Sequence, residues 1–325
     1  MCHILGVWTV SRRRLKIIAV IVFIGVLLLS TLYYFTYILH AVENIGMAVE
    51  FNDHAAAAWV ALEKKWFRDV GLNVTSLATF RTGLQLAAAI TRGDIDVAWA
   101  CLGPIIMAYA RGVPLKIVCM AHLHGYALVA KPEYESVEDL NGKVIACPGP
   151  GSPCWLLLRM VMEKYNIKAV VRKMPPHMAL NALLSGQIDA AALPEHYVTL
   201  AKLKGMRVLV RSQSIWPTMP GSVLVVKEEF LKRNPKAVKK LVEVTVRALN
   251  YINKHFEDSA RIVAKKLNIP YEAALESMRY LDYTYEIDLN EVQKYINLLV
   301  KYGAIGKPFN ASDIVDTRFL KEVMG

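Results

Sequence analysis

Short apolar runs alternate with longer amphipathic segments over most of the chain. The first apolar run of the body covers residues 45–51 and predicts a buried strand. Apolar side chains then recur at helical spacing over residues 55–69, and residues 74–79 form a second apolar run. Strand, helix and strand in this order predict a parallel sheet with right-handed crossovers.

The same alternation continues to residue 226, after which helical spacing dominates. Further strands, two of them with an entering turn, are predicted at residues 93–100, 115–120, 143–147, 169–173, 186–191, 207–210 and 222–226. Helices are predicted at residues 82–91, 103–112, 155–165, 178–184, 194–205, 227–233, 235–256, 258–267, 271–281 and 290–302.

Three positions repeat at one constant offset. The matched pairs are Gly93 with Gly186, Asp96 with Asp189, and Gly112 with Gly205. Any α/β lobe reuses such turns, but three matches in register favour two similar lobes. We expect lobe 1 to comprise residues 41–123 and 213–325, and lobe 2 to be an insertion, residues 124–212, joined by two crossovers. The helical C-terminal tail is expected to pack on lobe 1.

The N-terminal segment has the pattern of a membrane anchor or a signal peptide. A basic cluster in residues 1–16 precedes an uncharged run, residues 17–39, that is long enough to cross a bilayer. Its length and tyrosine-rich end favour an anchor over residues 17–40, and cleavage near Ala41 is the alternative. The basic cluster predicts a cytoplasmic N-terminus, with the body outside at the cell membrane.

Composition narrows the class of partners. The formal net charge of +11 at pH 7 includes the N-terminal cluster, and the other basic residues are spread over helical segments. No basic patch is interleaved with exposed aromatic residues, so nucleic-acid binding is not predicted. The moderately basic body favours anionic ligands or an anionic membrane surface. The sequence has no phosphate-loop lysine motif, so any ATPase would be another subunit.

Four of the five cysteines lie in the part predicted to be exported, where disulfides are permitted. Cys147 and Cys154 flank a Pro/Gly turn and can be bridged only if their Cα atoms lie within about 7 Å. Free buried thiols are the commoner outcome for cysteines in apolar strands. No histidine or cysteine pair has the spacing of a zinc motif, so neither a metal nor a cofactor is expected.

The strongest pattern for ligand binding is residues 143–158, with the sequence KVIACPGPGSPCWLLL. It predicts a buried strand, a glycine-rich turn and a helix, with Ser152 as N-cap and Pro153 as the first helical residue. Free N–H groups and the positive end of the helix dipole then suit a small anion or carbonyl. The alternative is an ordinary strand-to-helix connection that binds nothing.

Ligands of open parallel sheets lie beyond the carboxyl ends of the strands. Applied to lobe 1, this rule selects the candidate ligand-binding residues Asn52, Asp53, His54, Arg81, Cys101, Leu102 and Gly103. For the crossover and lobe 2 it selects His124, Gly151, Ser152, Pro153, Cys154, Glu195 and His196. No catalytic residue is predicted among them.

Histidines are concentrated at these strand ends and crossovers. Five of the eight lie there, namely His54, His122, His124, His177 and His196. They can donate hydrogen bonds to an oxyanion and gain charge as the pH falls through about 6.5. The alternative is that most are loop or capping residues.

Several motifs resemble those of a known family. Residues 61–74, ALEKKWFRDVGLNV, resemble an opening segment of solute-binding proteins of nitrate-, sulfonate- and taurine-type ABC importers. Residues 140–146 are similar to their DLKGKKVA segment, residues 149–152 to their Gly-Ser turn, and residues 186–190 to their GxIDA motif. The resemblance covers residues 45–325.

The resemblance implies an α/β, two-lobed type II periplasmic-binding-protein fold that closes on a small solute. With the other features, it predicts a helical C-terminal tail and an N-terminal transmembrane helix. Leu193-Pro194-Glu195 departs from the Trp-Glu-Pro of many members, so an aromatic wall of the pocket is missing or supplied elsewhere.

The expected function is that of the extracytoplasmic solute-binding component of an ABC importer, not an enzyme. It would capture a small anionic solute, such as a sulfonate, nitrate or a taurine-like compound, and work as a monomer with permease and ATPase subunits. The alternative is an enzyme or binding protein of thiamine-pyrimidine or menaquinone precursor metabolism, because these share the fold. For an enzyme, Cys154 is the only candidate thiolate. A third possibility is a structural or signalling domain.

Overall fold

The structure is a computed structural model that describes residues 19–31 and 43–325. Residues 19–31 form a helix, and the compact body is Asn44–Gly325. Within the two described ranges, no helix combines the length and apolar character needed to cross a membrane.

Parts of the N-terminal prediction cannot be compared with the structure. The predicted cytoplasmic segment, residues 1–16, and the alternative cleavage position near Ala41 lie outside the described residues. Only residues 19–31 of the predicted anchor, residues 17–40, are described.

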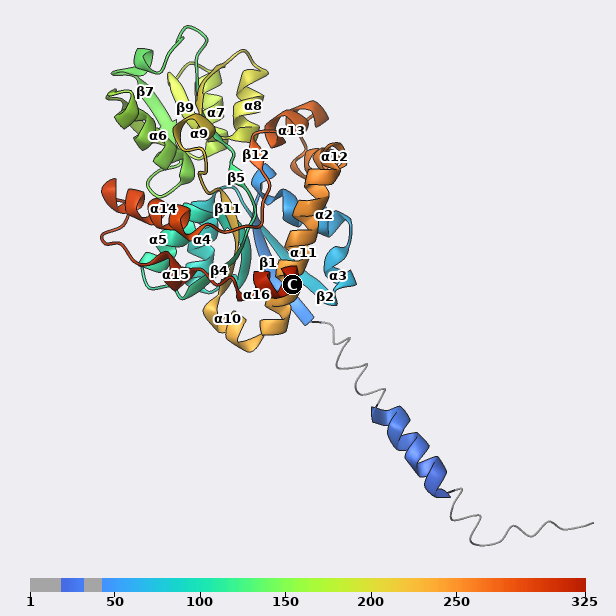
Figure 1. The fold of residues 1–325 in the computed structure, drawn as a ribbon. Helices are drawn as coiled ribbons and strands as arrows, with labels where there is room; N and C mark the ends of the chain where they lie inside the picture. The colour runs from blue at the N-terminus through green and yellow to red at the C-terminus, as the bar shows by residue number, and fades with distance from the viewer. Residues whose placement is uncertain (1–18, 32–42) are drawn as a thin grey trace, which may run out of the picture. The chain divides into compact units, whose positions relative to one another are not determined.

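Two five-stranded sheets form the framework of the body (Figure 1). The first sheet has the order β2-β1-β3-β11-β4 and the second β10-β6-β9-β7-β8, and β5 pairs with β12 in a separate ribbon. The strands are β1 Glu43–Glu50, β2 Leu72–Phe80, β3 Val97–Cys101, β4 Leu115–Met120, β5 Leu123–His124, β6 Tyr126–Ala130, β7 Val144–Cys147, β8 Val170–Lys173, β9 Ala190–Pro194, β10 Arg207–Arg211, β11 Ser222–Lys227 and β12 Leu281–Asp282.

Helices cover both faces of each sheet. Those before β11 are η1 Asp53–Ala55, α2 Ala56–Glu63, α3 Trp66–Asp69, α4 Gly83–Arg92, α5 Leu102–Ala110, η2 Glu138–Leu140, α6 Pro153–Lys164, α7 Pro176–Leu184, α8 Glu195–Lys202 and α9 Ser212–Ile215. Those after it are α10 Glu228–Arg233, α11 Pro235–Lys254, α12 Phe256–Leu267, α13 Tyr271–Met278, α14 Leu289–Lys301, α15 Ala311–Ile314 and α16 Arg318–Met324. We call the elements β6 to α9 lobe 2 and all other elements of the body lobe 1.

The direction of two strands differs from the parallel prediction. β1 and β3 are parallel, as are β7 and β8, but β11 runs antiparallel to β3 and β4. In lobe 2, β6 runs antiparallel to β9 and β10. β6 and β11 each follow a crossover between the lobes, so they enter their sheets from the edge where the other strands end.

The predicted helix over residues 55–69 is broken in the structure. α2 ends at Glu63, and Lys65 adopts a left-handed conformation, with φ of 62°, before α3 begins. The break lets Trp66 pack edge-on against Tyr251 of α11, with ring centroids 5.3 Å apart. Tertiary packing therefore overrides the continuous helical spacing.

The strand–turn–helix prediction for residues 143–158 is confirmed. Ser152 is the N-cap of α6 and its hydroxyl accepts a hydrogen bond from the Trp155 amide, while Pro153 is the first helical residue. Gly149 and Gly151 have φ of 113° and 84°, which glycine adopts without strain. Cys147 and Cys154 are buried free thiols, so no disulfide closes the turn.

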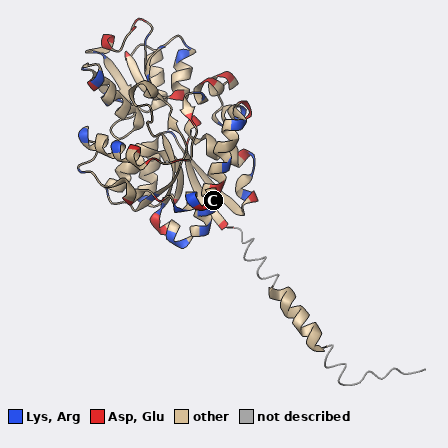
Figure 2. Ribbon diagram, viewed as in Figure 1, with Lys and Arg blue, Asp and Glu red and all other residues tan. Residues whose placement is uncertain are grey.

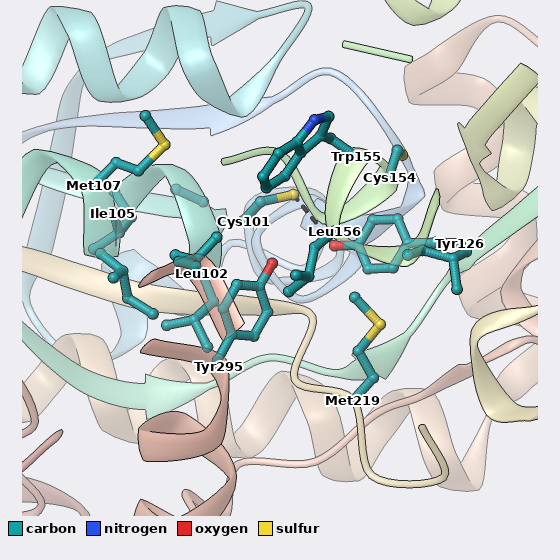
Figure 3. Close-up of a cluster of buried hydrophobic side chains, with 14 of the residues drawn as sticks. Cys101, Leu102, Ile105, Met107, Tyr126, Cys154, Trp155, Leu156, Met219 and Tyr295 are labelled. Carbon is teal, nitrogen blue, oxygen red and sulfur yellow. Dashed lines mark hydrogen bonds between the residues drawn. The ribbon is translucent and has the colours of Figure 1, made fainter. Parts of the chain in front are cut away.

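One hydrophobic core continues from lobe 1 into lobe 2. Leu102, Ile105 and Tyr295 of lobe 1 belong to the same buried cluster as Tyr126 and Leu156 of lobe 2 (Figure 3). The lobes are therefore packed against each other.

On the surface of the body, Lys and Arg are interspersed with Asp and Glu over the outer helices (Figure 2).

Candidate ligand-binding cleft

A narrow cavity lies between the two lobes. Its lining comprises Glu50, Asn52, Arg81, Thr82, Gly83, Leu84, Cys101 and Pro104 from lobe 1, and Tyr126, Pro148, Ser152, Pro153, Cys154, Pro176, Pro194 and Tyr197 from lobe 2. The space open to the centre of a water-sized molecule is about 20 Å³, little more than one water requires. The lobes are therefore closed on the cavity.

The structure brings six of the predicted ligand-binding residues together in this lining: Asn52, Arg81, Cys101, Ser152, Pro153 and Cys154. The other eight lie outside the lining: Asp53, His54, Leu102, Gly103, His124, Gly151, Glu195 and His196. Their role in binding remains a prediction.

Glu50 is the most unusual residue of the lining, because the residue is only 4% exposed and its carboxylate is surrounded by donors. The Cys101 amide donates to Oε1 at 2.6 Å, and the Cys101 thiol to Oε2 at 3.3 Å. The Asn52 amide nitrogen lies 3.3 Å from Oε2, and the Gly83 backbone also donates to the carboxylate. Burial raises the pKa of Glu50, and these hydrogen bonds oppose the rise.

Glu50 was not predicted from the sequence, although a signal existed. It is the last residue of β1, and the strand-end rule that selected Asn52 applies equally to a carboxylate at the end of an apolar strand. Tyr126 was missed for another reason. Its strand, β6, is short and buried on both faces, so it shows no alternation of apolar and polar positions.

The lobe 2 wall of the cavity includes the N-terminal end of α6. Ser152 caps this end, and Pro153 has no N–H, so Cys154 carries the first backbone N–H of the helix. The helix has 12 residues, and its dipole adds partial positive charge at this end.

The Cys154 thiol itself has no sign of activation. Burial raises the pKa of Cys154 well above its ordinary value, so the side chain remains a thiol at neutral pH. Cys101 is similar, since burial and the adjacent Glu50 raise its pKa. Within residues 19–31 and 43–325, no group of three or more His, Cys, Asp and Glu is arranged to hold a metal ion.

Beside the cavity, Asp53 and His196 join the lobes. His196 Nδ1, at the start of α8, lies 3.2 Å from Asp53 Oδ1, and both side chains are buried. Burial opposes ionisation of Asp53, but the hydrogen bond from His196 and the charges of His196 and His54 outweigh it and lower the Asp53 pKa to about 2.

The histidines of lobe 1 and the crossover face inward. His54 Nε2 donates to the Gly125 carbonyl at 3.0 Å, and burial lowers the His54 pKa to about 4. Burial also lowers the pKa of His122, whose ring centroid lies 4.6 Å from that of His54. His124 faces Asp282 of β12, with 3.4 Å between Nε2 and Oδ2. His54 and His122 therefore do not gain charge near pH 6.5, contrary to the expectation for cleft imidazoles.

Two further residues predicted to bind ligand, Glu195 and Gly103, contact other residues of the protein instead of the cavity. Glu195 is fully buried and accepts a hydrogen bond from Arg211 at 3.0 Å. Burial raises the Glu195 pKa to about 7, and the Arg211 charge opposes the rise. Gly103 at the start of α5 lies against Gly151 of lobe 2. Gly103 thus lies at the contact between the lobes, and neither Glu195 nor Gly103 lines the cavity.

Comparison with known proteins assigns the chain to a family. The model of the NMT1-like family matches residues 42–268, more than half of the chain. The chain belongs to the NMT1-like family. This NMT1-like protein is 27% identical over 275 residues to a Brucella abortus relative provisionally named a binding protein, covering 78% of this chain and 84% of the relative.

Other matches agree with the fold. The Escherichia coli taurine-binding periplasmic protein is 26% identical over 214 residues, which cover 63% of the NMT1-like chain and 66% of that protein. The alkanesulfonate-binding protein of Xanthomonas axonopodis pv. citri, bound to MOPS, aligns with a TM-score of 0.76 and 18% identity, covering 85% of this chain and 99% of that one. The body therefore has the α/β periplasmic-binding-protein fold.

Proposed function

We propose that this protein is the extracytoplasmic solute-binding component of an ABC importer. The observation that carries the proposal is the cavity between the lobes, in which a few polar groups converge from both sides. The fold and the taurine- and alkanesulfonate-binding matches support the same function. A two-lobed type II arrangement, with the boundary between the lobes at residues 124 and 212, would let the cavity open and close.

The solute is proposed to be small and to carry an anionic group, as in a sulfonate, nitrate or a taurine-like compound. Arg81, exposed after β2, supplies a guanidinium at the cavity, and α6 supplies its N-terminal end. The fourteen residues predicted from the sequence remain the proposed binding set, with the six that line the cavity as its centre.

We further propose that residues 17–40 direct the body out of the cytoplasm, as an anchor or a signal peptide. The uncharged run after a basic cluster supports this export. Permease and ATPase subunits would complete the importer, and the binding protein would act as a monomer. Protease treatment of intact cells tests the location, because an extracytoplasmic body is digested without lysis.

A binding role is favoured over catalysis. The candidate nucleophile Cys154 is buried, and its raised pKa keeps it protonated. None of the lining residues of the cavity is a histidine. The other thiol of the lining, Cys101, lies 3.8 Å from His54 Nδ1, but burial raises its pKa as well, so it also stays protonated, whereas a polar cavity between the lobes fits solute capture.

A thermal-shift screen with the full chain tests this function. The panel is nitrate, sulfonates, taurine, dicarboxylates and pyrimidine precursors. Binding to the folded state stabilises it by mass action, so at least one class should raise Tm in proportion to the logarithm of its concentration. A panel in which every member leaves Tm unchanged would contradict the proposal.

A further inference from the structure

The Glu50 carboxylate lies where two helices of lobe 1 begin. Gly83 is the first residue of α4 and Cys101 is the N-cap of α5, and the backbone amides of both residues donate to Glu50. Together with the Asn52 side chain, they surround one buried carboxylate that lines the cavity. Helix N-termini with free amides are the usual receptors for an anionic ligand.

In this chain, therefore, the Glu50 carboxylate accepts the hydrogen bonds that lobe 1 could otherwise donate to an oxyanion. The fit is close, because a Cβ on Gly83 would lie against Glu50 Oε1. A carboxylate has about four acceptor positions, of which the Cys101 amide, Asn52 and Gly83 take three, while the Cys101 thiol, 3.3 Å from Oε2, also lies within reach of His54 and Tyr126. A second anion at this end would lose these donors and meet a like charge.

The surroundings also match the ionised form of Glu50. The Cys101, Asn52 and Gly83 groups around it are hydrogen-bond donors, so a proton on the carboxyl group would face donors rather than acceptors. The Cys101 thiol stays protonated, because burial and Glu50 raise its pKa, and it can donate as well. Positive charge lies elsewhere in the lining, at Arg81 and the start of α6.

We propose that Glu50 is a built-in anion that selects the solute, so that the preferred solute presents a cationic or hydrogen-bond-donor group to Glu50 and its acid group to Arg81 and α6. This inference rests on the proposed function and narrows its solute class from small anions to molecules that carry both groups. Simple oxyanions such as nitrate, and sulfonates without an amine, are poor solutes for this cavity.

Calorimetric titration of the full chain with matched solutes tests the inference. The pairs are taurine with ethanesulfonate and β-alanine with propionate, which differ only in the amine, and nitrate is titrated alone. A hydrogen bond to a charged group contributes enough for the aminated member of a pair to bind at least ~10-fold more tightly. This comparison uses the unmodified protein and does not depend on the folding of a variant.

The variant Glu50→Gln assigns the preference to Glu50. We expect it to reduce the ratio of affinities within a pair by ~10-fold. The control Glu63→Gln removes a carboxylate that pairs with Lys265 and Lys266 away from the cavity, and it should leave the ratio unchanged. Circular dichroism establishes that each variant is folded.

The outcomes separate the two proposals. Equal or tighter binding of the solute without the amine overturns the built-in anion and leaves the importer function standing. A preference that persists in folded Glu50→Gln also overturns the role of Glu50. Binding by no member of the panel overturns the solute class and the proposed function together.

Discussion

Gly103 of lobe 1 and Gly151 of lobe 2 meet backbone to backbone, with no room for a side chain on either residue. A Cβ built on Gly103 would lie closer to the Gly151 carbonyl oxygen than the 3.0 Å that real Cβ atoms keep, and a Cβ on Gly151 would overlap the Met107 thioether. The glycines thus allow the lobes to close beside the cavity.

The variant Gly103→Ala should therefore impair closure. The added methyl group clashes with Gly151, and solute affinity measured by calorimetry should fall at least ~10-fold. The methyl group also approaches the Tyr295 hydroxyl of lobe 1, so a destabilisation of about 1–3 kcal/mol is expected in urea unfolding. Gly306→Ala is the control, because nothing lies near its Cβ position. Unchanged affinity in Gly103→Ala would show that binding does not need this contact.

Two of the ion pairs between the lobes should differ in strength. Asp53–His196 is buried, whereas Lys202–Glu276, with 3.1 Å between the charged atoms, is partly exposed to solvent. Asp53→Asn leaves a buried imidazole without its charged partner and should cost about 3 kcal/mol in urea unfolding. Lys202→Met breaks the exposed pair and should cost less than about 1 kcal/mol. Equal losses would mean that burial of the first pair has no energetic consequence.

The contribution of His54 to stability should fall as the solution is acidified from pH 6.5 towards pH 4, whereas Glu195, whose pKa burial raises to about 7, contributes in the opposite direction. Burial lowers the His54 pKa to about 4, so in this range the unfolded chain binds a proton at His54 that the folded chain does not. Since stability decreases where the unfolded state binds more protons, His54 alone should contribute a loss of about 3 kcal/mol. Urea unfolding at several pH values measures it.

Variants separate His54 from the other histidines in this measurement. His54→Gln should lose less unfolding free energy than the unmodified chain between pH 6.5 and pH 4, while His122 and Glu195 keep their own opposing contributions. His255→Gln, at an exposed position, is the matched control and should keep the original slope. An identical slope in His54→Gln and the unmodified chain would refute the assignment.

Loss of the Ser152 cap should destabilise the wall of the cavity. Its hydroxyl accepts from the Trp155 amide, and an N-cap is worth about 1 kcal/mol, so Ser152→Ala should lower the unfolding free energy by about that amount. Ser185→Ala removes a hydroxyl that donates to Ala182 at the end of α7 and should have a smaller effect. Similar effects would indicate that the cap is unimportant for α6.

The sequence predicts most elements of the fold because apolar spacing and turn residues agree locally. Ser152 and Pro153 are found at the start of α6 as expected, and the repeated glycines Gly93 and Gly186 both follow helices. The features of the fold that the local pattern does not predict are determined by tertiary packing. The break at Lys65 serves the packing of Trp66, and nothing in the spacing of residues 55–69 indicates it.

The site is predicted less completely than the fold, for a related reason. The strand-end rule selects the edge of the sheets at which the cavity lies but cannot tell which side chains line it. Asp53 and His54 lie next to Asn52 in sequence, yet they contact His196 and Gly125 instead of lining the cavity. Such pairings between the lobes depend on how the lobes close, which one chain segment does not encode.

Calorimetric titration of the unmodified chain, Arg81→Ala and Arg92→Ala with the solute panel tests the central claim most directly. Arg81 lines the cavity, whereas Arg92 pairs with Asp94 on the surface. We expect one solute to bind the unmodified chain with 1:1 stoichiometry, Arg81→Ala to bind it at least ~10-fold more weakly, and Arg92→Ala to bind it normally. No binding by any solute, or equal binding by all three proteins, would contradict a solute site between the lobes.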